Sequence, residues 1–231
     1  PVIIKILFSL ALTFIVFPLL WSQGVRIDEK IFDSPLKVTV TIGSEILFGM
    51  MVGFVARWVF EAVQTAGYLI GSSMGFSIAS VFDPHSESNV IPIAELQYIL
   101  AAFLLLGLDG HHLYLMTLIH SFKTLPLGEI SIFANSESVI QYLIQMSAEV
   151  LSLGLRLSAP VLIVILLSNL GFSILARAVS QMNVLVITFT ANLAIGVVIL
   201  FVSLPGFINL VDLAFESYTP EIIRFMRLLH G

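Results

Sequence analysis

Residues 184–204 read VLVITFTANLAIGVVILFVSL, a run without one charged side chain. A helix needs about 20 apolar residues to cross roughly 30 Å of hydrocarbon, so this run is long enough for a membrane span. Outward from it, further charge-free intervals lie between Arg156 and Arg177, Glu61 and Asp83, and Lys5 and Arg26. Short alternating segments typical of membrane barrels are missing from the sequence, and backbone groups in lipid must be satisfied internally. The sequence therefore predicts an all-α, membrane-associated protein.

The composition excludes several other classes of protein. Of the 231 residues, 58% are hydrophobic and only 11% are charged, and the mean hydropathy is +1.04. Soluble domains are about 25% charged, so an ordinary soluble enzyme is excluded. A net charge of −5 with 10 Lys+Arg supplies no basic face for nucleic acid. There is no cysteine, no Gly-Xaa-Ser-Xaa-Gly elbow and no nucleotide-binding loop. We expect no enzyme activity and no cofactor.

The alternation of apolar runs with polar or proline-containing segments predicts the helix boundaries. Pro205-Gly206 are expected to end the last long helix, and Pro160 is expected to bend or break the one before it. The C-terminal tail, 207–231, is amphipathic. Helices are predicted over residues 2–20, 44–74, 93–108, 111–122, 139–176 and 184–204.

Two series of glycines recur every fourth residue along the predicted helix 44–74. Gly49 and Gly53 form the first series, and Gly67 and Gly71 belong to the second, which extends to Gly75. Such spacing lays bare backbone along one stripe, where another helix can approach closely. Ordinary packing within the chain is one interpretation; close packing between subunits, or a flexible hinge beside a pore, is the other, and both stay open.

Four charged residues lie within otherwise apolar helices. Arg57 and Glu61 are one turn apart, and Glu149 and Arg156 are two turns apart. A lone charge at the centre of a membrane helix costs about 2.5–3.5 kcal/mol on insertion scales. We expect these groups to pair within the chain or with a partner, and we favour structural pairing over a proton relay.

The adjacent histidines His111 and His112 raise the question of a metal site. Adjacent residues on a helix point about 100° apart, which suits one ion poorly, and no acidic cluster stands at zinc spacing. We expect a polar helix start after Asp109-Gly110 and no metal site.

The segment 74–92 changes abruptly from apolar to polar. It begins Met74-Gly75-Phe76-Ser77-Ile78-Ala79-Ser80-Val81-Phe82-Asp83-Pro84. Pro84 disfavours the helical conformation at Asp83. Non-helical backbone at membrane depth must be buried in protein or line a cavity, and Met and Phe are flexible or bulky enough to close a hole. A simple re-entrant connector is the alternative.

Here the sequence resembles a known family. The run 66–77 followed by Asp83-Pro84 is similar to the FliR/SctT family of the flagellar and type III secretion export apparatus. Asp109-Gly110-His111-His112 resembles the family's Asn-Gly-His segment, with Asp in place of Asn. Two further segments match in order, Ser121-Phe122 with Pro126 and Gly128, and residues 177–183, where Ser180 replaces the usual Pro.

The resemblance implies a division of the chain into two parts. Residues 1–136 correspond to a FliP-like half that carries the segment 74–92. Residues 137–231 resemble the small FliQ subunit, a long helical hairpin with a Gln-Ile-Asn motif at its tip, here followed by the amphipathic tail. Arg177, Gln181 and Asn183 occupy this tip. The resemblance puts them at an assembly contact with a FliQ-type neighbour or an FlhB-type switch subunit.

The resemblance implies that the protein is a core subunit of an export gate in the bacterial inner membrane, at the flagellar basal body. One copy would close a ring with several FliP-type and FliQ-type subunits, around the channel through which unfolded export substrates enter. We interpret the segment 74–92 as the plug of that channel, with Met74 to Ile78 and Val81 to Pro84 as its gate residues. A small-solute permease is the alternative, but it needs a midplane site between inverted repeats, and the two parts of this chain are unlike. An intramembrane enzyme is a further alternative, which would need a nucleophile with a base or a metal cluster.

Overall fold

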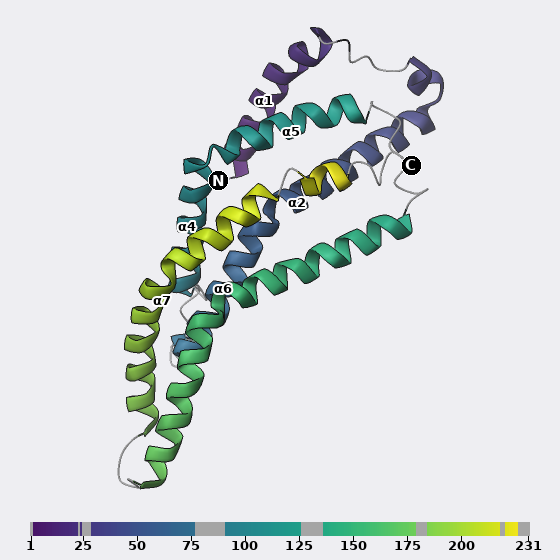
Figure 1. The fold of residues 1–231 in the computed structure, drawn as a ribbon. Helices are drawn as coiled ribbons and strands as arrows, with labels where there is room; N and C mark the ends of the chain where they lie inside the picture. Colours follow the sequence, from purple (N-terminus) through teal and green to yellow (C-terminus); the bar gives the residue numbers. More distant parts are fainter. Residues whose placement is uncertain are drawn as a thin grey trace. The chain divides into compact units, whose positions relative to one another are not determined.

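The computed structural model describes residues 2–22, 24, 29–76, 91–125, 136–178, 184–217 and 220–225 (Figure 1). In this part of the chain every regular element is a helix, which confirms the predicted all-α fold. The elements are α1 (Val2–Ser22), the 3-10 helix η1 (Glu29–Asp33), α2 (Pro35–Met74), α4 (Pro92–Gly107), α5 (Gly110–Thr124), α6 (Ser136–Ala178) and α7 (Val184–Glu216).

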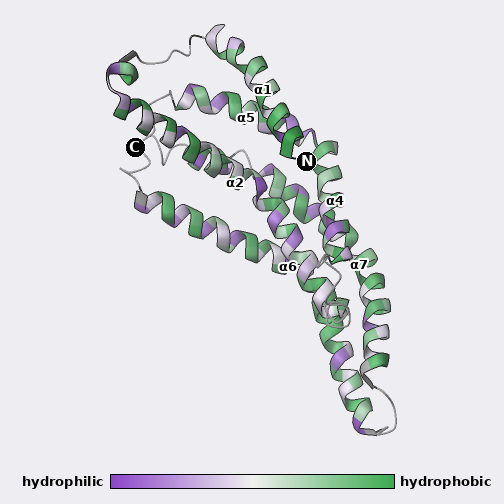
Figure 2. Ribbon diagram, turned by 180° about the vertical axis from the view of Figure 1, so that it is seen from behind, coloured by the Kyte–Doolittle hydropathy of each residue, from purple (hydrophilic) through white to green (hydrophobic). Residues whose placement is uncertain are grey.

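Within the part of the chain that the structure describes, four helical stretches are long and apolar enough to cross a membrane. They are Val2–Ser22, Pro35–Met74, Glu137–Arg177 and Val186–Phe225, and the pair α4 and α5 would add a fifth if counted as one interrupted span. The hydropathy colours in Figure 2 show apolar residues along the length of these helices. The membrane-type character predicted from the charge-free intervals is therefore confirmed.

Two predicted boundaries were wrong. Helix α7 does not end at Pro205-Gly206 but continues to Glu216. Helix α6 is one long helix with Pro160 inside it, and a bend at Pro160 stays a prediction. A proline removes one intrahelical hydrogen bond, and apolar helices tolerate this where packing holds the next turn. Here Phe207 and Val211 are buried directly after Pro205. Helix α2 begins at Pro35, nine residues earlier than predicted, because proline suits the first turn of a helix.

The chain forms two compact units, and each is described by itself. Unit 1 comprises Pro1–Ala56, Asp109–Ile144 and Tyr218–Gly231, and unit 2 comprises Arg57–Leu108 and Gln145–Ser217. In unit 1, α1 contacts α5, and the Tyr114 hydroxyl donates a hydrogen bond to the backbone oxygen of Ala56 at 3.1 Å. The division of the sequence after residue 136 into FliP-like and FliQ-like parts stays a prediction.

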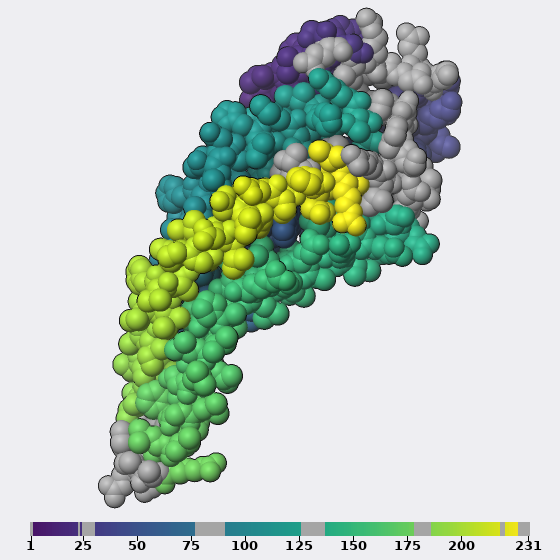
Figure 3. All heavy atoms as spheres, in the orientation of Figure 1, coloured from purple at the N-terminus to yellow at the C-terminus, as the bar shows by residue number. Residues whose placement is uncertain are grey.

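Unit 2 is held by a core between α2, α6 and α7. Its buried side chains are Ile70, Met74, Val161, Ile165 and Leu200. Helix α4 packs on α7, and Figure 3 shows the side chains of α7 lying directly against those of α6 towards residues 178 and 184. Gly154 lets α6 approach α2, since a Cβ there would be 3.1 Å from the backbone oxygen of Ala62.

Candidate functional site

The glycines of the second series hold α2 against the start of α4. A Cβ at Gly67 would collide with the backbone of Ala94, and one at Gly71 would collide with the side chain of Ile91. Ile91 is the residue before Pro92, the first of α4. Residues 71 and 91 are therefore in contact; residue 71 lies just before the segment 74–92 that we interpret as the plug, and residue 91 lies at its end.

The first residues of that segment are anchored in the core of unit 2. Met74 is fully buried, and its side chain occupies the space that a Cβ at Gly196 would need. Gly75 has a φ of +98° and its N–H bonds to the backbone oxygen of Ser72 at 3.1 Å, so it ends α2 in a conformation that favours glycine. Phe76 is half-buried against the same core. Ser77, Ile78, Val81, Phe82, Asp83 and Pro84 lie outside the described residues.

The first glycine series has a different environment from the second. A Cβ at Gly49 or at Gly53 would meet no atom of the described residues within 4 Å, and both positions are exposed. The same four-residue spacing thus marks a close helix contact at Gly67 and Gly71 and an open stripe at Gly49 and Gly53.

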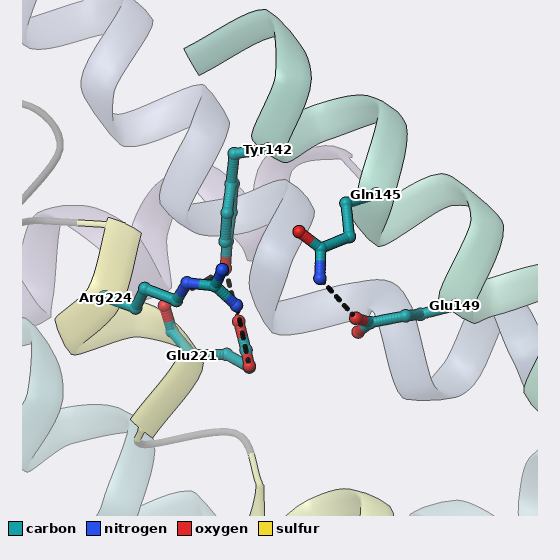
Figure 4. Close-up of polar contacts among 5 residues, drawn as sticks. All are labelled: Tyr142, Gln145, Glu149, Glu221 and Arg224. Carbon is teal, nitrogen blue, oxygen red and sulfur yellow. Dashed lines mark hydrogen bonds and ion pairs between the residues drawn. The ribbon is translucent and has the colours of Figure 1, made fainter. Parts of the chain in front are cut away.

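The four charged residues differ in their partners. Arg57 Nη2 and Glu61 Oε1 are 2.7 Å apart, and the two side chains are 70% and 41% exposed. Glu149 accepts a hydrogen bond from Gln145 Nε2 at 3.2 Å (Figure 4). Arg156 is exposed, and no ion pair joins it to Glu149 in the described part of the chain. Of the two pairs, Arg57 with Glu61 is therefore the one that forms an ion pair among the described residues.

The tip between α6 and α7 is described only at its edge. Arg177 lies in the last turn of α6 and is exposed, where a cation suits the helix C-terminus. Gln181 and Asn183 lie outside the described residues.

Three potential metal-ligand atoms lie close together at the start of α5. They belong to Asp109, His111 and His112 and all lie within 4.8 Å of one another. His112 Nδ1 and Asp109 Oδ1 are 3.7 Å apart, and both side chains are exposed. Asp109 itself has a φ of 54°, the left-handed conformation that starts α5. The contact between Asp109 and His112 involves two of these donor atoms, whereas His111 Nδ1 is buried and has no hydrogen-bond partner among the described residues. The absence of a metal site stays a prediction.

Two polar contacts were not predicted from the sequence. Tyr142 is buried, and its hydroxyl lies 3.0 Å from the backbone oxygen and 3.2 Å from Oε2 of Glu221 (Figure 4). Its ring stacks on Phe225, and Glu221 also faces Arg224 at 4.0 Å. Residues 220–225 are thereby docked on the first turns of α6.

The second unpredicted contact joins α6 to α7. Asn192 Nδ2 donates a hydrogen bond to Asn169 Oδ1 at 2.8 Å, and Ser168 Oγ donates one to Asn192 Oδ1 at 3.1 Å. The available signal was the presence of asparagines inside two charge-free intervals, where polar side chains are rare.

Comparison with known proteins decides the family. The model of the bacterial export proteins, family 1, matches residues 1–218. The chain belongs to this family. The resemblance to the FliR/SctT proteins is thereby confirmed, because the relatives are flagellar biosynthetic proteins FliR.

Three relatives show the extent of the similarity. FliR of Escherichia coli K12 is 30% identical over 205 residues, which cover 89% of this chain and 75% of that protein. FliR of Bacillus subtilis 168 is 30% identical over 187 residues, 81% of this chain and 72% of the relative. FliR of Aquifex aeolicus VF5 is 27% identical over 206 residues, 89% and 76% of the two chains.

Proposed function

We propose that this export-family protein is a core membrane subunit of the flagellar export apparatus in the bacterial inner membrane. It completes a helical ring with FliP-type and FliQ-type subunits, around the channel through which unfolded substrates enter. The observation that carries the proposal is the family match over residues 1–218, with relatives named flagellar biosynthetic proteins.

The apolar surface of the chain supports a place in a larger assembly. Large apolar side chains stay exposed on the spanning helices, among them Phe14 at 79%, Ile174 at 72% and Val202 at 71%. Exposed apolar surface of this extent is covered by lipid or by other subunits. We expect the chain to purify from membranes as part of a large helical complex. A monomer with solute uptake would instead favour the permease.

The plug proposal rests on how the segment 74–92 is held. Its first residue, Met74, is locked in the core of unit 2, and the contact between Gly71 and Ile91 fixes the chain on both sides. A segment fixed at both ends can be displaced by a passing chain and return. Its apolar residues would exclude water and ions while the channel is closed.

The test replaces the apolar residues of the plug and leaves its anchor intact. Ile78, Val81 and Phe82 are changed together to Ser, and Ser77 and Ser80 are changed together to Ala as a control in the same segment. We expect higher ion conductance through the assembled complex for the first variant and unchanged conductance for the control. Unchanged conductance of the first variant in a fully assembled complex would refute the plug.

The charges and the tip are proposed as assembly contacts. Arg57 and Arg156 are exposed and Glu61 is half-buried in this chain; lipid is a costly surrounding for charged groups, so neighbouring subunits are the better partners. For the tip, we expect Gln181→Ala or Asn183→Ala to weaken association with the FliQ-type neighbour or the FlhB-type subunit. Intact co-purification of the complex carrying both changes would contradict this.

A further inference from the structure

The hydrogen bonds that join Ser168 and Asn169 of α6 to Asn192 of α7, called the asparagine bridge below, lie in an apolar environment. Asn192 is 5% exposed, and both its amide oxygen and its amide nitrogen are hydrogen-bonded, to Ser168 and to Asn169. Both helices belong to stretches long and apolar enough to cross a membrane. A buried amide is tolerated in such surroundings because its hydrogen bonds are made.

The asparagine bridge and the buried core of unit 2 are consistent with the same alignment of α6 and α7. Val161 precedes Asn169 by eight residues on α6, and Leu200 follows Asn192 by eight residues on α7. Val161 and Leu200 belong to the same buried core. The two helices therefore run antiparallel in unit 2, as Figure 1 shows, with the bridge two turns closer to the tip than the core.

Apolar packing alone does not single out this alignment. Around the bridge, α6 and α7 carry mostly Leu, Ile and Val, so a slip of one turn would replace one apolar contact by another. The same slip would separate Asn192 from Asn169 and leave a buried amide without a partner. A single buried asparagine is known to fix the register of paired helices in this way.

The alignment sets the position of the tip. Asn169 is nine residues before Ala178, the last residue of α6, and Asn192 is eight residues after Val184, the first of α7. A one-turn slip would move one helix end past the other by about 5.4 Å. Residues 179–183 connect these two ends.

We propose that Asn192 is a positioning residue, which fixes the stagger of α6 and α7 through Asn169 and so presents the tip to its partner subunit. The second half of this statement rests on the proposed role of Arg177, Gln181 and Asn183 in assembly. The effect of Asn192 on the stagger of α6 and α7 can be measured without that role.

The test uses the absence of cysteine from the chain. Cysteine pairs are introduced at Val161 and Leu200 for the native alignment and at Leu157 and Leu200 for a one-turn slip. Both are oxidised in membranes with the FliP-type and FliQ-type subunits co-expressed. Asn192→Leu should shift the ratio of native to slipped cross-links about three- to fifteen-fold, the range of hydrogen bonds between membrane helices. Asn209→Leu, at an exposed position of the same helix, should leave the ratio unchanged.

A rescue experiment separates positioning from direct contact with a partner. Asn192→Leu should lower co-purification with the FliQ-type or FlhB-type subunit, and the 161–200 disulfide in that variant should restore it. An unchanged cross-link ratio would overturn the register role, and lost co-purification that the disulfide does not restore would overturn positioning. If instead Gln181→Ala and Asn183→Ala leave the complex intact, the assembly role of the tip fails while the cross-link ratio still reports the register.

Discussion

Gly196→Ala tests how tightly α7 holds the end of α2. An added Cβ would lie 2.7 Å from Cε and Cγ of Met74 and 2.8 Å from its Sδ. Met74 is fully buried against Ile70 and Val161, so its side chain cannot swing into solvent and the core must repack. Overpacking of this kind costs about 1–3 kcal/mol. The ratio of folded to unfolded chain should fall about 5- to 150-fold.

The matched control is Gly206→Ala on the same helix. A Cβ there meets nothing within 4 Å, so the change should stabilise α7 by up to about 1 kcal/mol through helix propensity. Met74→Ala removes the colliding atoms at a cost of about 2–5 kcal/mol for the cavity. In that background, Gly196→Ala should cost nothing further or should stabilise the chain.

The free energy of unfolding is measured by denaturant titration of the detergent-purified complex. Because the chain has no cysteine, one introduced cysteine on α7 can carry a fluorophore as the reporter. Equal stabilisation by Gly196→Ala and Gly206→Ala would show that Met74 is not packed against Gly196. The same loss from Gly196→Ala with and without Met74→Ala would refute the contact as its cause.

Two further predictions concern the other contacts of the chain. Gly71→Leu should lower the amount of chain in membranes, measured by quantitative immunoblot, because its side chain would collide with Ile91; Gly49→Leu, at an open position, should not. An equal drop for both would show that the second glycine series is not specially packed. Tyr142→Phe keeps the ring and removes the hydrogen bond to Glu221, a loss of about 1 kcal/mol, so proteolysis of the C-terminal segment should become about five-fold faster. An unchanged cleavage rate would contradict that role of the hydroxyl.

The helices could be predicted from the sequence because charge marks the limits of apolar runs. The ends of helices were harder. Pro205 was expected to stop α7, but local sequence does not reveal that Phe207 and Val211 are buried and hold the next turn. The charged residues up to Lys37, together with Pro35, made residues 22–37 resemble a connection, although α2 already begins at Pro35.

The candidate sites show the same limit of prediction from local sequence, because the pattern along one helix does not reveal what packs against it. Gly49 and Gly67 belong to series of identical spacing, yet among the described residues α4 packs closely against Gly67 and no helix packs against Gly49. The bridge between Asn169 and Asn192 was missed because hydropathy does not report which residues of two helices face each other. The spacing of residues along one helix identifies its apolar face. It does not identify the residues that pack against that face, because these depend on how the two helices are aligned in three dimensions.

The contact of Gly71 with Ile91 has a consequence for how the family can vary. With the two sides of residues 77–90 held together, the helical frame does not depend on how many residues connect them. Doubling the length of a flexible connection costs only about 0.6 kcal/mol of closure entropy. Insertions between residues 76 and 91 should therefore leave α2 and α4 undisturbed, so the length of this connection can change without a change in the two helices that it joins.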